Sequence, residues 1–68
     1  MTEHLQPASS WVASIYYDDE NQVLQITTKQ GRTITKIDVP PDVWEELKQA
    51  PSIGQAINAH ILGSYENG

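Results

Sequence analysis

Apolar and polar positions alternate through the first half of the chain, which is the pattern of half-buried strands. β-Branched and aromatic residues, which favour strands, are concentrated in the same segments. Polar residues at 18–22 and 29–32 separate these segments and predict two hairpin turns, the second with Gly31 free to take a positive φ. The pattern therefore predicts three antiparallel strands, at residues 11–17, 23–28 and 33–39.

The hydrophobic spacing changes after Pro40, from two residues to three or four. Proline cannot donate to a strand ladder, but it suits the first position of a helix. A first helix is therefore expected from Pro41 to about Ala50, and a second between Ser52 and Gly63. The expected apolar faces consist of Val43, Trp44 and Leu47 on the first helix, and of Ile53, Ile57 and Ile61 on the second.

Three strands followed by two short helices predict a small α+β fold. It is a three-stranded antiparallel β-meander with both helices packed on one face (βββαα). We expect one folded domain over residues 11–65, preceded by a flexible arm at residues 1–10 and followed by a tail at residues 66–68.

The chain has no cysteine, so its core must hold the fold without disulfides. No segment is apolar over the roughly 18 residues that a membrane span needs. The first ten residues lack the basic and apolar regions of a signal peptide. We therefore expect a soluble, cytoplasmic protein with no membrane partner.

The loop at residues 29–32 decides which side chains lie on the open face of the sheet, because a shift of one residue exchanges the two faces. A two- or four-residue loop would pair Thr28 with Thr33 and place Ile34 on the open face. A bulge or a three-residue loop would turn Ile34 into the core. We expect the first arrangement, which makes an apolar patch with a basic edge, typical of interaction sites. This open face would carry Val12, Tyr16, Ile34 and Lys36.

The chain has nine acidic and four basic residues, a net charge of −5. This balance disfavours broad contact with a phosphate backbone. Three of the four basic residues, Lys29, Arg32 and Lys36, nevertheless fall within eight positions, whereas the acidic residues gather at 18–20 and 42–46. The pattern fits ordinary solubilising charge or a local basic edge on a polarised molecule.

Catalytic and metal-binding chemistry is not indicated by the sequence. His4 and His60 are the only histidines, and neither has a second histidine or convergent carboxylates at helical spacing. The segment that begins at Gly54 lacks the ending of a phosphate-binding loop. We expect no cofactor, no metal and no enzymatic activity.

The order of residues over positions 9–65 resembles the KTSC domain family. This family comprises small stand-alone bacterial and phage proteins and the C-terminal extension of some lysyl-tRNA synthetases. The most specific motifs are Asp38-Val39-Pro40, Ala50-Pro51-Ser52 with Gly54, and Asn58-Ala59-His60-Ile61 with Gly63 and Tyr65. The resemblance implies the same small α+β fold.

The link to a tRNA ligase implies RNA or a translation partner. The family tends to have aromatic residues at the positions of Thr28, Ile34 and Lys36, which this chain lacks. It also lacks the aromatic and basic residues expected around Ala56, Leu62 and Ser64. These are the groups that would stack on bases or contact phosphates, so the RNA role is weakened here.

The leading hypothesis is a small non-catalytic interaction module, a bacterial or phage regulator, that binds a protein partner through its open sheet face. One alternative is an RNA- or tRNA-binding accessory domain. Another is a self-associating module that buries the face in a homodimer. The candidate partner-binding residues are Trp11, Val12, Tyr16, Lys29, Arg32, Ile34 and Lys36.

Overall fold

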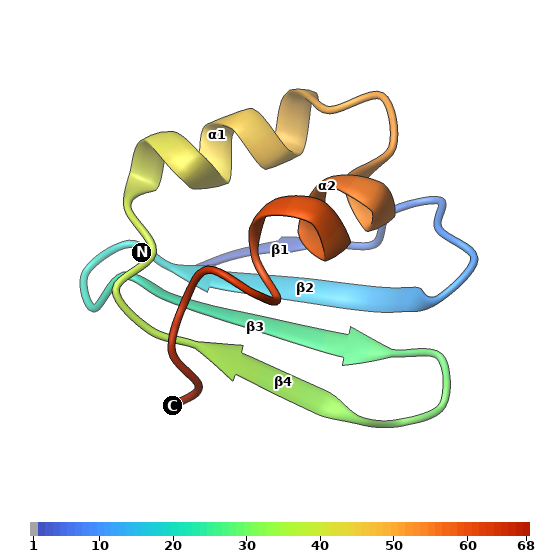
Figure 1. The fold of residues 1–68 in the computed structure, drawn as a ribbon, viewed down its shortest axis with the longest axis horizontal. Coiled ribbons are helices and arrows are strands. Elements are labelled where there is room, and N and C mark those ends of the chain that lie inside the picture. The colour runs from blue at the N-terminus through green and yellow to red at the C-terminus, as the bar shows by residue number, and fades with distance from the viewer. Residues whose placement is uncertain (1) are drawn as a thin grey trace.

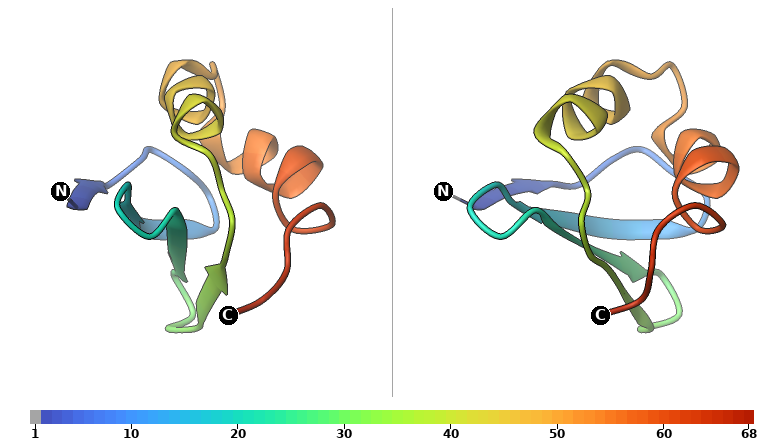
Figure 2. Two further views of the ribbon diagram at one scale, coloured as in Figure 1. Left: turned by 90° about the vertical axis from the view of Figure 1, so that its left-hand side faces the viewer. Right: turned by 60° about the vertical axis from the view of Figure 1, so that its left-hand side comes forward.

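The computed structural model describes residues 2–68 in two layers, an antiparallel sheet and two helices on one of its faces (Figure 1 and Figure 2). The α+β class is confirmed, but the sheet has four strands instead of the expected three. The strands lie side by side in chain order. Their bounds are Thr2–Leu5 (β1), Val12–Asp18 (β2), Val23–Thr28 (β3) and Thr33–Lys36 (β4), and the helices are Pro41–Gln49 (α1) and Ile53–His60 (α2).

The additional strand, β1, lies where the sequence predicts a flexible arm. It pairs antiparallel with β2. The carboxylate of Glu3 accepts a hydrogen bond from Trp44 Nε1 and another, at 3.3 Å, from Lys48 Nζ, so side chains also attach β1 to α1. Most residues of this edge strand are exposed, so it shows no alternation of apolar residues. Main-chain pairing and the Glu3 contacts hold it, together with the stacking of His4 on Tyr16 and the packing of Leu5 against the core.

An aromatic pair lies at the centre of the core between the sheet and the helices. The rings of Tyr17 and Trp44 stack with centroids 5.3 Å apart, and the Tyr17 hydroxyl donates to Val39 O at 2.7 Å. Burial raises the pKa of Tyr17, which keeps this donor protonated. Trp44 is therefore in the core, as its helical spacing predicts. The buried apolar residues are Val12, Ile15, Tyr17, Leu24, Ile26, Val39, Trp44, Leu47, Ile57 and Ile61.

A β-bulge in β2 turns Val12 into this core. The pairing of β2 with β3 shifts between Val12 and Ser14, which inserts one extra residue into β2. Val12 consequently lies on the same face as Ile15 and is fully buried. The expectation that Val12 lies on the open face is wrong, because strict alternation along a strand does not allow for the bulge.

The main-chain pairing continues past the two strands to Thr28 and Arg32, which leaves a three-residue loop at 29–31, the arrangement that the sequence leaves as the alternative. Thr28 N donates to Arg32 O at 2.8 Å, and Gly31 has a φ of 90°. This loop pairs Ile26 with Ile34 and so turns both Ile34 and Lys36 toward the helices. The expectation that these two side chains lie on the open face is therefore wrong by one residue of register.

The start of α2 packs tightly against the segment before β2. Ser52 caps the helix by accepting a hydrogen bond from Gln55 N at 3.4 Å. Gly54, in the first turn, is buried, and a Cβ at this position would lie 2.6 Å from Ser9 Oγ and 2.9 Å from Trp11 Nε1. The absence of a side chain at Gly54 therefore allows the segment before β2 to approach α2.

We predict that Gly54→Ala lowers the free energy of unfolding by about 1–3 kcal/mol, because the added methyl group overpacks this contact. The measurement is urea unfolding followed by tryptophan fluorescence. Gly63→Ala is the matched control, since a Cβ there meets no atom within 4 Å, and its effect is expected to stay within about 0.5 kcal/mol. Equal stability of the two variants would contradict the proposed close approach.

A second prediction concerns acid stability. The hydrogen bond from Trp44, followed by that from Lys48, lowers the pKa of Glu3 below its ordinary value of 4.5. A carboxylate with a lowered folded-state pKa stabilises the protein above its unfolded-state pKa, and this contribution is lost as pH falls through the folded-state pKa. The deficit in unfolding free energy of Glu3→Gln should thus be largest near neutral pH and shrink below about pH 4.5. A deficit that is constant between pH 3 and pH 7 would rule out this linkage.

Candidate binding site

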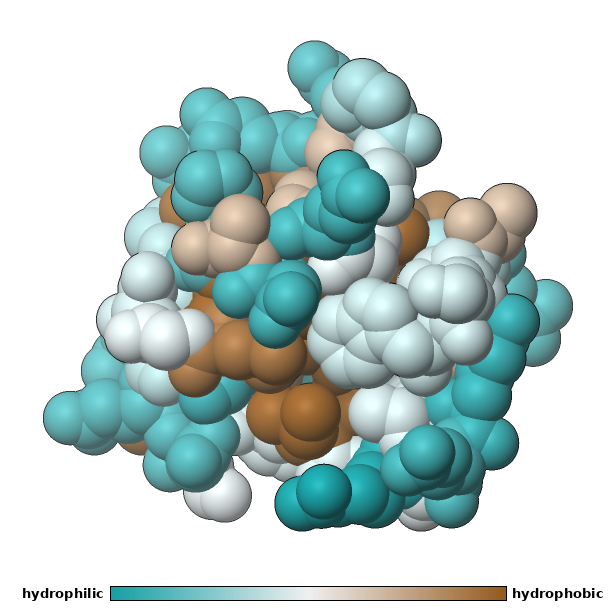
Figure 3. All heavy atoms as spheres, turned by 45° about the vertical axis from the view of Figure 1, so that its right-hand side comes forward, coloured by the Kyte–Doolittle hydropathy of each residue, from teal (hydrophilic) through white to brown (hydrophobic). Residues whose placement is uncertain are grey.

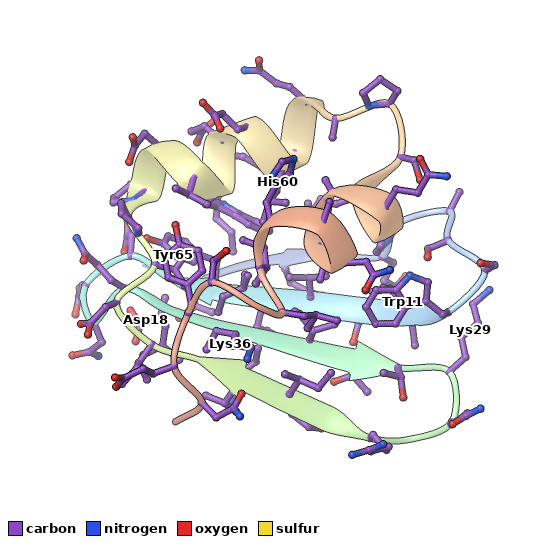
Figure 4. All side chains as sticks on the ribbon, viewed as in Figure 1. Trp11, Asp18, Lys29, Lys36, His60 and Tyr65 are labelled. Carbon is purple, nitrogen blue, oxygen red and sulfur yellow. The ribbon has the colours of Figure 1, made fainter. Side chains whose placement is uncertain are left out.

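Four of the seven candidate residues converge on one hollow at the end of the sheet that holds the second hairpin loop. Trp11 comes from the segment before β2, Lys29 and Arg32 from the loop region, and Ile34 from β4. Figure 4 shows Trp11 and Lys29 at this end, and Figure 3, which brings it forward, shows apolar surface bordered by hydrophilic residues. The hollow, here called the hairpin hollow, has a volume of about 350 Å³. Its lining residues are Ser10, Trp11, Thr28, Lys29, Gln30, Arg32 and Ile34.

Hydrogen bonds hold the walls of the hairpin hollow in place. Ser9 Oγ accepts hydrogen bonds from Trp11 N at 3.3 Å and Val12 N at 3.2 Å, which fixes the turn into β2. Trp11 O accepts from Lys29 N at 2.9 Å, so the main chains of the two walls are joined. The hydroxyl of Thr28 accepts from Arg32 N at 3.1 Å. The loop is therefore ordered where its two cationic side chains begin.

The two cations of the hairpin hollow have no acidic partner in the part of the chain that the structure describes. Within residues 2–68, neither Lys29 nor Arg32 forms an ion pair, whereas Lys48 is paired with Glu3 and Glu45. Both residues are exposed and lie beside the partly buried apolar side chains of Trp11 and Ile34. A surface of this composition suits a ligand that carries negative charge next to an apolar group.

The acidic turn at the opposite end of the sheet is held by hydrogen bonds between its own residues. Asp18 accepts hydrogen bonds from Asn21 Nδ2 at 2.8 Å and from Glu20 N at 3.0 Å, and the bond from Asn21 is the main cause of the lowered pKa of Asp18. Figure 4 places Asp18 and Lys29 at opposite ends of the sheet. The molecule is thus polarised along its strands, in the sense that the clustering of charges predicts.

Lys36 is a structural residue. Its side chain is 4% exposed, and Nζ donates to Leu62 O at 3.1 Å, Tyr65 O at 3.2 Å and Asn67 Oδ1 at 2.6 Å. An ammonium group has three donors, and all three are used here. Lys36 therefore attaches the segment after α2 to β4 (Figure 4) and is not available to a partner.

Tyr16 alone among the candidates lies on the open face of the sheet. It is 42% exposed, and its ring stacks on that of His4 with centroids 4.3 Å apart. Its neighbours across β3 and β4 are the polar residues Gln25 and Thr35. The open face is therefore largely polar, and Tyr16 lies apart from the hairpin hollow.

Sequence reasoning missed the polar lining of the hairpin hollow, Ser10, Thr28 and Gln30. They flank residues that it did select, and the three-residue loop is what brings them together. No group of three or more metal-ligating side chains is found within residues 2–68. Neither helix is long and apolar enough to cross a membrane.

Comparison with known proteins identifies close relatives of the domain. Residues 8–65 match the family model of the KTSC domain. A crystal structure of a KTSC domain protein from Yersinia pestis superposes with a TM-score of 0.87 at 28% identity, over 100% of this chain and 96% of that one. A protein of Tsukamurella paurometabola is 33% identical over 58 residues, which are 84% of this chain and 87% of that protein.

A larger relative carries a similar sequence as a small part of its length. The lysine–tRNA ligase of Nostoc punctiforme is 36% identical over 62 residues, which are 91% of this chain. The match covers only 11% of the ligase. The similarity therefore concerns one segment of that enzyme.

The structural role of Lys36 predicts its mutational effect. Lys36→Met removes three hydrogen bonds and leaves partly buried carbonyl groups without this donor, so we expect a loss of about 1–3 kcal/mol in unfolding free energy. The amides of Ile37 and Gly68, which bond across this segment, should also exchange faster with solvent. The exposed Lys29→Met serves as control and should change stability by less than about 0.5 kcal/mol. If both variants keep wild-type stability, Lys36 does not hold the C-terminal segment.

Proposed function

The chain belongs to the KTSC domain family, and from this premise we propose that it is a non-catalytic interaction module that binds a protein partner at the hairpin hollow. The observation that carries the proposal is that Lys29 and Arg32, beside Trp11 and Ile34, form no ion pair within the described residues of a chain of net charge −5. The site is therefore moved from the open sheet face, where the sequence predicts it, to the end of the sheet. A cytoplasmic location is part of the same proposal.

The chemistry of the partner follows from that of the hollow. Trp and Arg are enriched among the residues that dominate binding energy at protein interfaces, and the hollow combines both with an aliphatic side chain. The charges of Lys29 and Arg32 favour an acidic partner and speed its association. We infer a partner segment in which an apolar side chain enters beside Trp11 and Ile34 and an adjacent carboxylate meets the cations.

An RNA ligand is the second candidate. It is favoured by the relationship to the lysine–tRNA ligase and by Trp11, a ring beside two cations on which a base could stack. It is disfavoured by charge, because Lys36 and Lys48 are engaged within the fold and leave two cations for phosphates. It predicts binding that falls steeply with salt concentration.

The proposal is tested by selecting peptides from a random dodecapeptide display library and measuring their affinities by calorimetry. Lys29→Gln with Arg32→Gln should weaken the selected peptides about tenfold, as expected for two charge contacts of up to about 1 kcal/mol each at the surface. The matched control, Gln49→Glu with Asn58→Glu, changes the net charge equally at exposed positions of the helices and should leave affinity nearly unchanged.

Two results would overturn the proposal. One is a selection that yields no peptide sensitive to the hollow variant, and the other is an equal loss of affinity in both double variants. Labelled tRNA, titrated at low salt concentration, is measured in parallel. Salt-sensitive tRNA binding without peptide binding would replace the protein partner with RNA.

A further inference from the structure

The outer edge of β4 is half covered by the chain's own C-terminal residues. Lys36 pairs with Asn67 in an antiparallel bridge, which is flanked by hydrogen bonds from Ile37 N to Glu66 O at 3.0 Å and from Gly68 N to Thr35 O at 2.9 Å. The described C-terminal residues end opposite Thr35. This edge therefore already accepts an extended segment in antiparallel pairing, and none of residues 2–68 pairs with the outer side of β4 from Ile34 toward the hairpin loop.

The N–H and C=O groups of successive residues in β4 point alternately toward β3 and away from it, which shows which of them remain available to a partner. Arg32 O accepts its hydrogen bond from β3, and Thr35 O accepts from the outer side. Successive residues of a strand direct their main-chain groups to opposite sides. Thr33 therefore directs its N–H and C=O away from β3, into the open half of the edge.

The open edge continues into the hairpin hollow. A groove of about 390 Å³ follows β4, and it shares Arg32 and Ile34 with the hollow. Leu62, which follows α2, and Gly68 also line this groove. One extended segment that lies along the edge can therefore pair its main chain with β4 and project side chains into the hollow.

We propose that the partner binds by adding an antiparallel strand to the open half of β4. The inference rests on the proposed function, and it specifies the conformation and the sequence of the partner segment. We infer an extended, antiparallel partner segment because Asn67 already pairs with Lys36 of this edge in an antiparallel bridge.

The register fixes the side chains that the partner must carry. Its residues opposite Ile34 and Arg32 point to the helix face, toward the hollow, and the residue between them, opposite Thr33, points away. An apolar side chain is required opposite Ile34 and a carboxylate opposite Arg32. The partner motif, in its own chain direction, is an apolar residue, any residue, then Asp or Glu.

A second copy of this chain fits the open edge less well. Pairing two β4 strands about Thr33 would bring the two Arg32 side chains to diagonal positions on the same face, where like charges repel. An acidic segment of another protein satisfies the same positions. The charge on the edge therefore selects the foreign segment as occupant.

The test uses Thr33→Pro, which removes the outward N–H without removing a bond of the β3–β4 ladder. Thr33→Val keeps the N–H and serves as matched control. The peptides selected by display should bind Thr33→Pro about tenfold more weakly, as expected for the loss of a main-chain hydrogen bond with its partner left unpaired, and should bind Thr33→Val within about twofold of wild type. Urea unfolding verifies that both variants are folded.

A second measurement does not depend on the variant. The C-terminally amidated pentapeptide Val-Thr-Glu-Val-Thr carries the motif and begins opposite Ile34, since Gly68 lies opposite Thr35. On NMR titration it should slow solvent exchange of the Thr33 amide of the wild-type protein. The same peptide N-methylated at its first Thr, the residue opposite Thr33, should lose binding about tenfold because its donor is removed. Replacing its Glu with Lys should abolish binding.

The outcomes separate the two proposals. Peptides that are sensitive to Lys29→Gln with Arg32→Gln, but indifferent to Thr33→Pro and to N-methylation, would overturn strand addition and leave the interaction module standing. Loss of binding on N-methylation together with protection of Thr33 supports strand addition. An unprotected Thr33 amide at saturating peptide overturns it.

Discussion

The pairing register of β3 and β4 is the constraint on which the rest of this molecule depends. The three-residue loop with Gly31 at positive φ sets Ile34 opposite Ile26. A strand has two faces, so a shift by one residue would exchange every side chain of β4 between the core and the open face. The register therefore places Ile34 against the core and Lys36 beneath the C-terminal segment.

Lys36 shows how this register propagates. An ammonium group turned into the helix layer needs acceptors, and the carbonyls after α2 supply them together with Asn67. The same contacts bring residues 66–68 to the edge of β4, where they cover half of it. A buried charge, the path of the C-terminal segment and the open half of the edge are thus consequences of one loop length.

The hairpin hollow has a similar origin. Trp11 is fixed by Ser9 and by the loop, and Gly54 lets it approach α2. Its surroundings gather residues from the segment before β2, the end of β3, the loop and β4, which no short segment of sequence contains. Charge separation then follows the strand direction, because the two hairpin turns lie at opposite ends of the sheet (Figure 4).

Much of the fold was predictable from the sequence, because hydrophobic spacing and the prolines report local structure. The positions of β2, β3 and both helices, and the burial of Trp44, follow from periods of two and of three to four residues. The resemblance in motifs likewise identified the KTSC family. Of the site, the sequence selected Trp11, Lys29, Arg32 and Ile34 but placed Ile34 on the wrong face.

The tertiary structure decided everything that depends on pairing between distant residues. β1 forms because its main chain pairs with β2 and Glu3 reaches α1, contacts that leave no periodic trace in a short polar segment. The bulge at Val12 and the three-residue loop each shift the strand register by one residue and so turn side chains to the other face of the sheet. Composition does not encode such a shift. The sequence alone therefore determined which residues are apolar, charged or helix-forming. The three-dimensional pairing determined which of them meet at the surface, because faces are set by register between strands.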